Sequence, residues 1–133
     1  MSLVFMDSVG LLALWSKSDQ WHDQAEQASN EITRNRDTLL TTTAVLLECG
    51  NAAARRGFRN EATLLRKSFE ASETLIWPTE ADWYQAWDAY QRGEANAAGI
   101  VDHISFTVMR RLGIAKAFTN DRHFRAAGFE TMF

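Results

Sequence analysis

Short apolar runs alternate with longer amphipathic segments along the whole chain, and this alternation limits the fold more than any other feature of the sequence. The apolar runs have the length of β-strands and occupy residues 3–6, 38–42, 74–78, 115–119 and 129–133. Strands that alternate with helices favour parallel pairing, because each helix carries the chain back along the sheet. The sequence therefore predicts an α/β protein, a three-layer α/β/α sandwich with a mostly parallel central sheet.

The segments between these runs have sequence features that begin and end helices. We expect helices over residues 8–16, 18–36, 43–57, 60–72, 79–93 and 100–113, and a short helical turn over 120–128. The residues expected at helix termini are Ser18 or Asp19, Gly57, Asn60, a Thr79–Asp82 capping box and Gly113. No Gly-, Pro- or Ser-rich linker divides the series.

Length and composition bound the function. A chain of 133 residues with 46% hydrophobic residues is expected to form a single domain, residues 1–133, with a substantial core. The formal net charge is −3. Because proteins that hold nucleic acid mainly by phosphate attraction are usually basic, an anionic ligand would have to meet a local patch or a metal ion.

Two further features concern location. Cys49 is the only cysteine, so no disulfide can form within the chain, and a reducing cytoplasm is the natural compartment. It lies in an alanine-rich helical run, where we expect it to be a small core residue. No apolar run approaches the ~18 residues that cross a bilayer, so we expect no membrane association.

Four carboxylates interrupt apolar surroundings, namely Asp7, Glu48, Asp102 and Asp121. Asp7 and Asp121 follow two predicted strands, and ligands of open parallel sheets bind beyond the carboxyl ends of the strands. An ionised carboxylate is costly to bury unless it is paired or bound to a metal. An all-oxygen ligand set suits Mg²⁺ or Mn²⁺. We therefore interpret the four acids as one divalent-metal site.

Each acid also has a purely structural explanation. Asp7 and Asp121 could cap the helices that follow them, and Asp102 could complement a helix dipole. Glu48 could pair with Arg55 or Arg56 further along its helix. Taken singly, these explanations compete well, whereas four such acids in this order favour a common site.

Three segments resemble a known family. "VFMDSVGLLAL", "TTTAVLLECGNAAARRG" and "GIVDHISFTVMRRLGIAKAFTNDRHFRAAGF" are similar to PIN-domain nucleases, especially the toxin ribonucleases of bacterial VapBC-type toxin–antitoxin pairs. The resemblance runs from Val4 to Phe129, and its most specific part is the C-terminal order Asp-x-x-Ser-Phe, Leu-Gly-Ile, Thr-x-Asp-Arg-His-Phe and Ala-Gly-Phe. It implies a PIN-like α/β/α fold and a metal-dependent endoribonuclease that hydrolyses RNA.

The resemblance also assigns roles to residues. The family's four catalytic acids fall on Asp7, Glu48, Asp102 and Asp121, which would hold Mg²⁺ or Mn²⁺. The hydroxyls of Ser8 and Thr119 would hold carboxylates or a phosphate oxygen in place. Implied partners are an RNA substrate, an antitoxin that blocks the site with a basic or aromatic segment, and a second copy of the chain.

The chain departs from the family pattern just before the third acid. Members often have the form Asp-x-x-Ser-x-x-Asp, and here Asn96 and Gly99 occupy the first two of those positions. An auxiliary acid is therefore absent, and the sequence leaves open whether Glu94 replaces it.

Three other assignments complete the sequence interpretation. Arg122, beside Asp121, is a weak candidate for substrate binding, and His123 is interpreted as a packing residue of the terminal turn. Trp83, Trp87 and Tyr90 form a stripe at helical spacing that suggests core or dimer contact more than base stacking. The main alternative function is a PIN-like module that binds RNA or protein without cleavage. The sequence has no Gly-x-Ser-x-Gly motif of a serine hydrolase and no Gly-rich phosphate loop of a nucleotide-binding protein.

Overall fold

A central sheet of five parallel strands organises the molecule. The computed structural model describes all residues from Met1 to Phe133. The strands are β1 (Leu3–Met6), β2 (Thr38–Thr42), β3 (Leu75–Ile76), β4 (Lys116–Phe118) and β5 (Glu130–Thr131). Their order is β3-β2-β1-β4-β5, and every neighbouring pair is parallel. The predicted fold class is confirmed.

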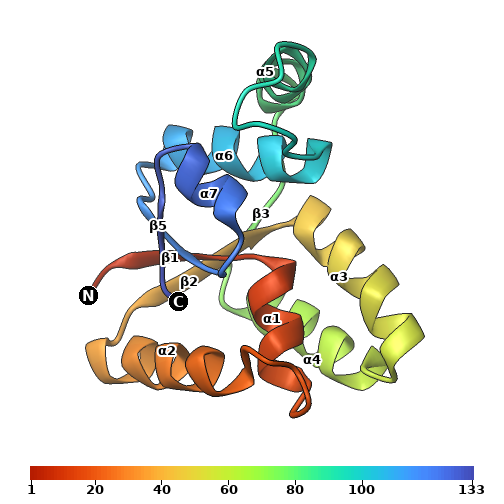
Figure 1. Ribbon diagram of the computed structural model, residues 1–133, viewed down its shortest axis with the longest axis vertical. Helices are drawn as coiled ribbons and strands as arrows, with labels where there is room; N and C mark the ends of the chain where they lie inside the picture. The colour runs from red at the N-terminus through yellow and green to blue at the C-terminus, as the bar shows by residue number, and fades with distance from the viewer.

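Seven helices connect the strands and cover the sheet. They are α1 (Ser8–Trp15), α2 (His22–Asn35), α3 (Thr43–Arg56), α4 (Arg59–Ala71), α5 (Glu80–Gln91), α6 (Ile100–Leu112) and α7 (Arg122–Ala126). In Figure 1, α1, α2 and α4 lie below the sheet, and α5, α6 and α7 lie above it. None of the helices combines the length and the apolar character that a bilayer span requires.

The two faces of the sheet have separate cores, and β1 contributes to both. Val4 and Met6 pack with α1, α2, α3 and α4, whereas Phe5 packs with α6 and α7. All three side chains are at most 4% exposed. This alternation is expected of a strand that is covered on both faces, and it explains why the predicted run is continuously apolar. Cys49 is buried in the first of these cores, as expected.

Local sequence features set several helix termini as predicted. Gly57 and Gly113 end α3 and α6 in the left-handed conformation, with φ of 82° and 69°. Thr79 and Asp82 form the predicted capping box of α5, with Thr79 N donating to Asp82 Oδ2 at 2.9 Å and Asp82 N donating to Thr79 Oγ1 at 3.0 Å.

Two predicted caps are wrong. The helix α2 begins at His22, because the Asp19 side chain accepts a hydrogen bond from Trp21 N at 2.8 Å and stabilises a turn before the helix. The helix α4 begins at Arg59, one residue before the predicted Asn60. There Phe58 N bonds to Ala53 O at 2.9 Å, which completes the end of α3 and directs the chain straight into α4.

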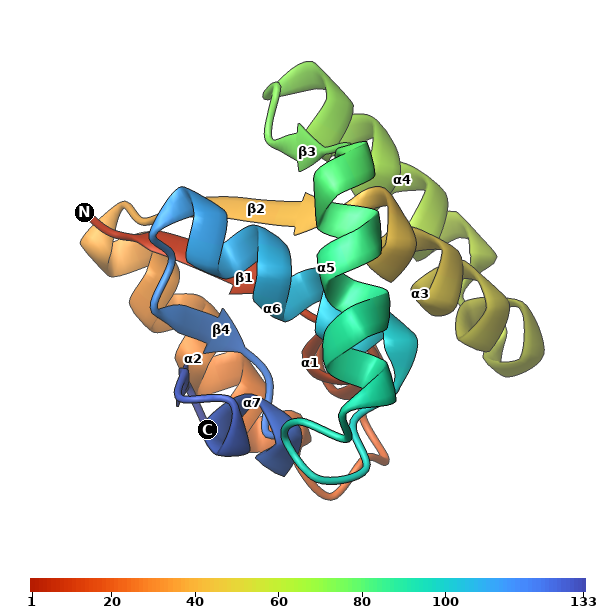
Figure 2. The same ribbon diagram turned by 90° about the horizontal axis from the view of Figure 1, so that it is seen from above.

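The topology brings the carboxyl ends of β1 and β4 together at the centre of the sheet. Met6 is paired with Phe118, so the residues that follow each strand lie side by side. In Figure 2, β1, β2 and β4 point the same way, and α3 continues beyond the end of β2. Gly10 allows α1 to pack tightly here, because a Cβ atom at this position would lie 2.2 Å from the carbonyl oxygen of Phe118.

Candidate metal centre

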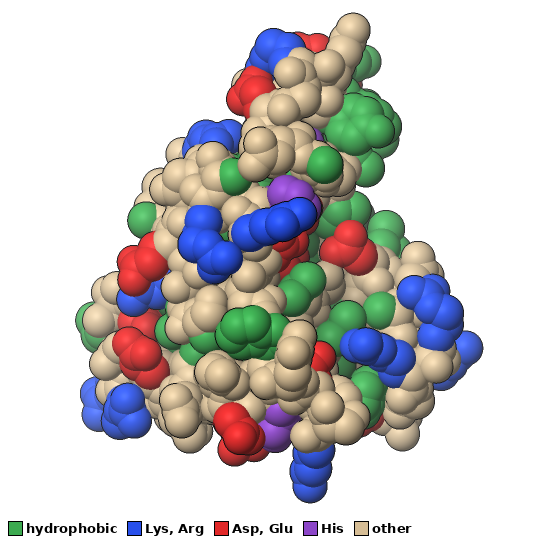
Figure 3. All heavy atoms as spheres, in the orientation of Figure 1, with side chains coloured by type: hydrophobic (Ala, Val, Ile, Leu, Met, Phe, Trp, Pro, Cys, Tyr) green, Lys and Arg blue, Asp and Glu red, His purple; other side chains and the backbone are tan.

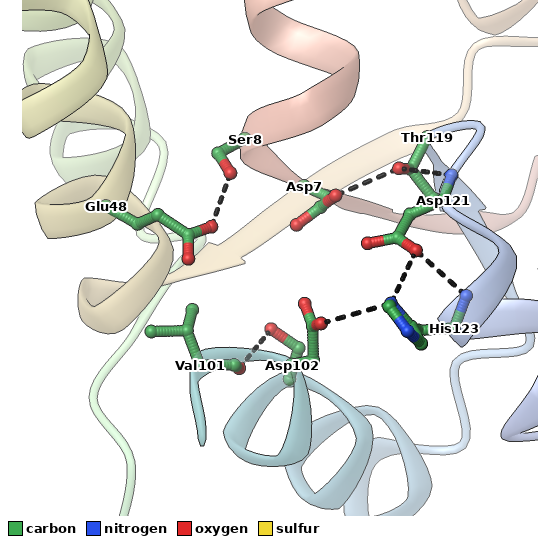
Figure 4. A network of polar contacts seen from close by, with 9 residues as sticks. Asp7, Ser8, Glu48, Val101, Asp102, Thr119, Asp121 and His123 are labelled. Carbon is green, nitrogen blue, oxygen red and sulfur yellow. Dashed lines mark hydrogen bonds and ion pairs between the residues drawn. The ribbon is translucent and has the colours of Figure 1, made fainter. Parts of the chain in front are cut away.

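The four acids identified in the sequence converge at this edge of the sheet. Asp7 follows β1, Asp121 lies between β4 and α7, Asp102 lies in the first turn of α6, and Glu48 projects from α3. Figure 4 shows their carboxylates facing a common space. Figure 3 shows acidic side-chain atoms in a recess on this face, beside a histidine and basic side chains.

Asp7 is the most deeply buried member of the group. Its side chain accepts a hydrogen bond from Thr119 Oγ1 at 2.9 Å through Oδ2, and its Oδ1 is buried without any hydrogen-bond partner. The residue is 1% exposed. Burial, and then the charge of Asp102, raise the pKa of Asp7 to about 7, and the hydrogen bond from Thr119 opposes this rise. Asp7 therefore lacks a countercharge that would stabilise its ionised form.

Asp102 has the same kind of environment. Burial, followed by the charges of Asp121 and Glu48, raises the pKa of Asp102 to about 6. A backbone hydrogen bond from Gly99, the N-cap of α6, and the nearby His123 lower it. Asp102 thus has the helix-terminal role that its position suggested, and it also faces the other acids. The two explanations that the sequence left open for this residue are compatible.

Asp121 caps α7 and adjoins a histidine. Its Oδ1 accepts a hydrogen bond from His123 N at 2.8 Å, and His123 Nδ1 lies 3.0 Å from the same oxygen. The same ring nitrogen lies 3.9 Å from Asp102 Oδ2. The interpretation of His123 as a packing residue is therefore wrong: its ring faces two of the acids. Ligand atoms of Asp102, Asp121 and His123 all lie within 4.8 Å of one another.

Glu48 reaches the group from an exposed position on α3. Ser8 Oγ donates a short hydrogen bond of 2.5 Å to Glu48 Oε1, so the glutamate pairs with neither Arg55 nor Arg56. The other oxygen points toward the same space as Asp7 and Asp102 (Figure 4). This link joins two residues 40 positions apart, which is why no local sequence feature predicted it.

The two hydroxyl residues singled out in the sequence both contact acids. Thr119 Oγ1 donates to Asp7 and accepts a hydrogen bond from Asp121 N at 3.1 Å, and it is fully buried. Ser8 is 3% exposed and holds Glu48. The Asp7 side chain makes no capping bond to α1, so the structural explanation of Asp7 fails.

The donor set fits a divalent cation. Four carboxylates face one space, two of them have raised pKa values because burial and like charge disfavour ionisation, and one buried oxygen has no partner. A divalent ion would neutralise the facing carboxylates, favour their ionised forms and give the buried oxygen a partner. Carboxylate oxygens suit Mg²⁺ and Mn²⁺.

Two neighbouring features complete the description. Arg122 is exposed at the first position of α7 and has no ion-pair or hydrogen-bond partner, so its role in substrate binding stays a prediction. Glu94, which could have replaced the missing auxiliary acid, is bound instead by Arg92, with Nε donating to its Oε2 at 2.7 Å in an exposed loop. Gly99 serves as the N-cap of α6.

Comparisons with known proteins agree with this geometry. The family model of the PIN domain matches residues 4–130. Among solved structures, the chain is similar to VapC20 of Mycobacterium tuberculosis, a sarcin–ricin-loop-cleaving toxin. The sequences are 27% identical, the TM-score is 0.79, and the match covers 95% of each chain. A search of curated proteins finds no significant match. The chain therefore belongs to the PIN-domain family.

Proposed function

We propose that this protein is a Mg²⁺- or Mn²⁺-dependent endoribonuclease and the toxin of a toxin–antitoxin pair. The observation that carries the proposal is the unpartnered, buried oxygen of Asp7 inside a group of four facing carboxylates. Membership in the PIN family and the similarity to a toxin that cleaves RNA support the reaction class.

The burial of each side chain suggests its role in the reaction. Asp7, Asp102 and Asp121 would hold the ion, which when bound supplies charge neutralisation for the phosphate and activation of water. Glu48 is exposed and fixed by Ser8, so its free oxygen can orient a water molecule toward the scissile phosphorus. Thr119 holds Asp7 and Asp121 next to each other, because its hydroxyl donates to the Asp7 carboxylate and accepts from Asp121 N. Hydrolysis with departure of the 3′-oxygen gives a 5′-phosphate product.

The test is cleavage of end-labelled RNA by purified protein with MnCl₂ or MgCl₂. We expect internal cuts that carry 5′-phosphates and that EDTA abolishes. An Asp102→Asn preparation purified in parallel excludes a contaminating ribonuclease, since a contaminant would cut equally in both. RNA binding without metal-dependent cleavage would support the alternative, a PIN-like module that binds but does not cut.

The substrate and partner follow from the same similarity. The first RNA to test is a sarcin–ricin loop hairpin, because the similar VapC20 cleaves that loop. An antitoxin would block the acidic recess with a basic or aromatic segment. Expression of the native protein in the bacterial cytoplasm without antitoxin should arrest growth. Expression of the Asp7→Ala variant should not.

A homodimer is part of the proposal, and the surface of α5 supports it. Trp83, Tyr84, Trp87 and Tyr90 are 39–62% exposed, whereas Ala86 packs against α6 and Ala89 is buried. The rings of Trp83 and Trp87 are 5.9 Å apart, and those of Trp87 and Tyr90 are 5.2 Å apart. An aromatic face of this kind is typical of a protein interface. Light scattering should show a dimer that Trp83→Ser with Trp87→Ser converts to a monomer.

A further inference from the structure

We infer that His123 is a direct ligand of the divalent ion, and that its ring nitrogen makes the site prefer Mn²⁺ to Mg²⁺. This inference rests on the proposed function, because it concerns the ion of the same site. It changes the donor set that the sequence implied, from oxygen atoms alone to oxygen atoms and one nitrogen.

The distances around His123 fit a shared ion. Ligand atoms bound to one octahedral ion at about 2.1 Å lie about 3.0 Å apart when adjacent and about 4.2 Å apart when opposite. His123 Nδ1 lies 3.0 Å from Asp121 Oδ1, the separation of adjacent ligands. It lies 3.9 Å from Asp102 Oδ2, between the two values. Only small side-chain adjustments would bring the three atoms to a common ion.

A backbone hydrogen bond places His123 next to Asp121. His123 N donates to Asp121 Oδ1 at the start of α7, and this bond holds the histidine beside the aspartate that precedes it by two residues. The side chain of His123 is 22% exposed, and those of Asp102 and Asp121 are 15% and 18% exposed. The three side chains can therefore be approached from solvent. Its Nε2 has no protein partner and can keep the proton while Nδ1 binds.

An independent observation indicates that a cation belongs here. Asp7 Oδ1 is buried without a hydrogen bond and points into the space that Asp102 borders (Figure 4). Buried carboxylate oxygens without a partner are rare in folded proteins. The other one in this molecule, Asp37 Oδ2, belongs to a carboxylate that lies 3.9 Å from the N-terminal ammonium, whereas Asp7 has no such cation. His123 lies beside Asp102 and Asp121 at one side of this space, so the donors around it include both oxygen and nitrogen (Figure 4).

The chemistry of the donors decides which ion benefits. Mg²⁺ binds oxygen and accepts nitrogen poorly, whereas affinity for sites that contain imidazole rises along the first transition series from Mn²⁺ onward. A histidine ligand therefore strengthens Mn²⁺ binding and contributes little to Mg²⁺ binding. Its loss should weaken Mn²⁺ binding about tenfold or more and Mg²⁺ binding about threefold at most.

The experiment measures binding without RNA. Titration calorimetry with MnCl₂ and with MgCl₂ is compared for the native protein, His123→Ala and His123→Asp. We expect His123→Ala to lose the Mn²⁺ preference, and His123→Asp to bind Mg²⁺ at least as tightly as the native protein because it supplies an oxygen donor. Electron spin echo measurements on bound Mn²⁺ should show directly bonded ¹⁴N in the native protein and none in either variant.

A matched control uses another histidine. His22 lies at the start of α2, where its Nδ1 is 3.0 Å from Ala13 O and its Nε2 is 3.0 Å from Glu26. The variant His22→Ala should keep both the affinity and the nitrogen signal. Equal losses for Mn²⁺ and Mg²⁺ in His123→Ala, or a native protein without nitrogen coupling, would overturn the inference while leaving the proposed function intact. A native protein that binds neither ion would overturn both.

Discussion

Two buried aspartates in this molecule have opposite electrostatic environments. Asp82 is 1% exposed and receives two hydrogen bonds from Arg111, at 2.9 Å to Oδ1 and 2.7 Å to Oδ2. It also receives the capping bond from Thr79, and these partners lower its pKa despite burial. Asp7 is equally buried, but it has one hydroxyl partner and three acidic neighbours, and its pKa is raised to about 7.

The difference teaches that burial alone does not mark a functional carboxylate. Asp82 has a permanent cation in Arg111, so its charge stabilises the packing of α5 against α6. Asp7 has no cation within the chain, so its charge is neutralised either by a proton, which its raised pKa favours, or by an external cation.

The largest effect should come from removing the charge of Asp7. Asp7→Asn keeps the size of the side chain and can still accept the Thr119 hydrogen bond, but it cannot hold a divalent ion well. We expect RNA cleavage to fall by roughly 10³-fold or more, since several kcal/mol of metal-ion stabilisation is lost. Single-turnover cleavage under saturating Mn²⁺ measures the loss, and circular dichroism should show an unchanged fold. Near-native cleavage by Asp7→Asn would refute the site.

The second effect concerns pH and the metal-free protein. Because the pKa of Asp7 is raised from 3.8 to about 7, the folded state binds a proton more tightly than the unfolded state between these values. Stability should therefore fall as pH rises from about 5 to 7, by on the order of 2–3 kcal/mol. Urea denaturation across this range in EDTA measures the slope, and added Mn²⁺ should reduce it.

Asp7→Asn supplies the control for this slope. Without the titrating carboxyl, most of the pH dependence should disappear, and the variant should be more stable than the native protein at pH 8 in EDTA. Because Asp102 also has a raised pKa, a smaller slope should remain near pH 5–6. An unchanged slope in Asp7→Asn would mean that another group causes it.

The features of the fold that were predicted correctly have local causes. The capping box of α5 and the glycine termini of α3 and α6 depend on residues within one turn of each other. The strand β2 was predicted with its observed bounds, because a run of β-branched and apolar residues is bounded by helix signals. The starts of α2 and α4 were predicted wrongly, since they depend on turns that the preceding segments impose.

The candidate site shows the same limit. The sequence indicated which acids are unusual, and the parallel topology explains why two of them meet. It could not predict that Ser8 pairs with Glu48, or that Arg111 pairs with Asp82, because these partners lie 40 and 29 residues apart. The position of His123 could have been anticipated: a residue two positions after a capping aspartate lies close to that carboxylate.

The third effect concerns Asp82, whose ionised form stabilises the protein, whereas the ionised form of Asp7 destabilises it. Asp82→Asn leaves Arg111 without its partner and weakens the contact between α5 and α6. We expect a loss of about 2 kcal/mol of stability at pH 7, less than for a fully buried pair because Arg111 is 40% exposed. The lowered pKa of Asp82 means that its contribution is lost only as pH falls below about 4. Mn²⁺ should not restore the loss, and a rescue by Mn²⁺ would contradict the contrast with Asp7.

The smallest effect should come from Thr119→Val, which removes the one hydrogen bond that favours the ionised form of Asp7. The pKa of Asp7 should rise further, so Mn²⁺ must displace a more tightly held proton, and its affinity at pH 7 should fall about threefold to tenfold. At pH 8.5 the difference should shrink, because Asp7 is then ionised in both proteins. Thr107→Val is the matched control, since Thr107 Oγ1 donates at 2.8 Å to His103 O within α6 and contacts none of the acids. A deficit in Thr119→Val that is equal at both pH values would show that the hydroxyl positions the carboxylate without tuning its charge.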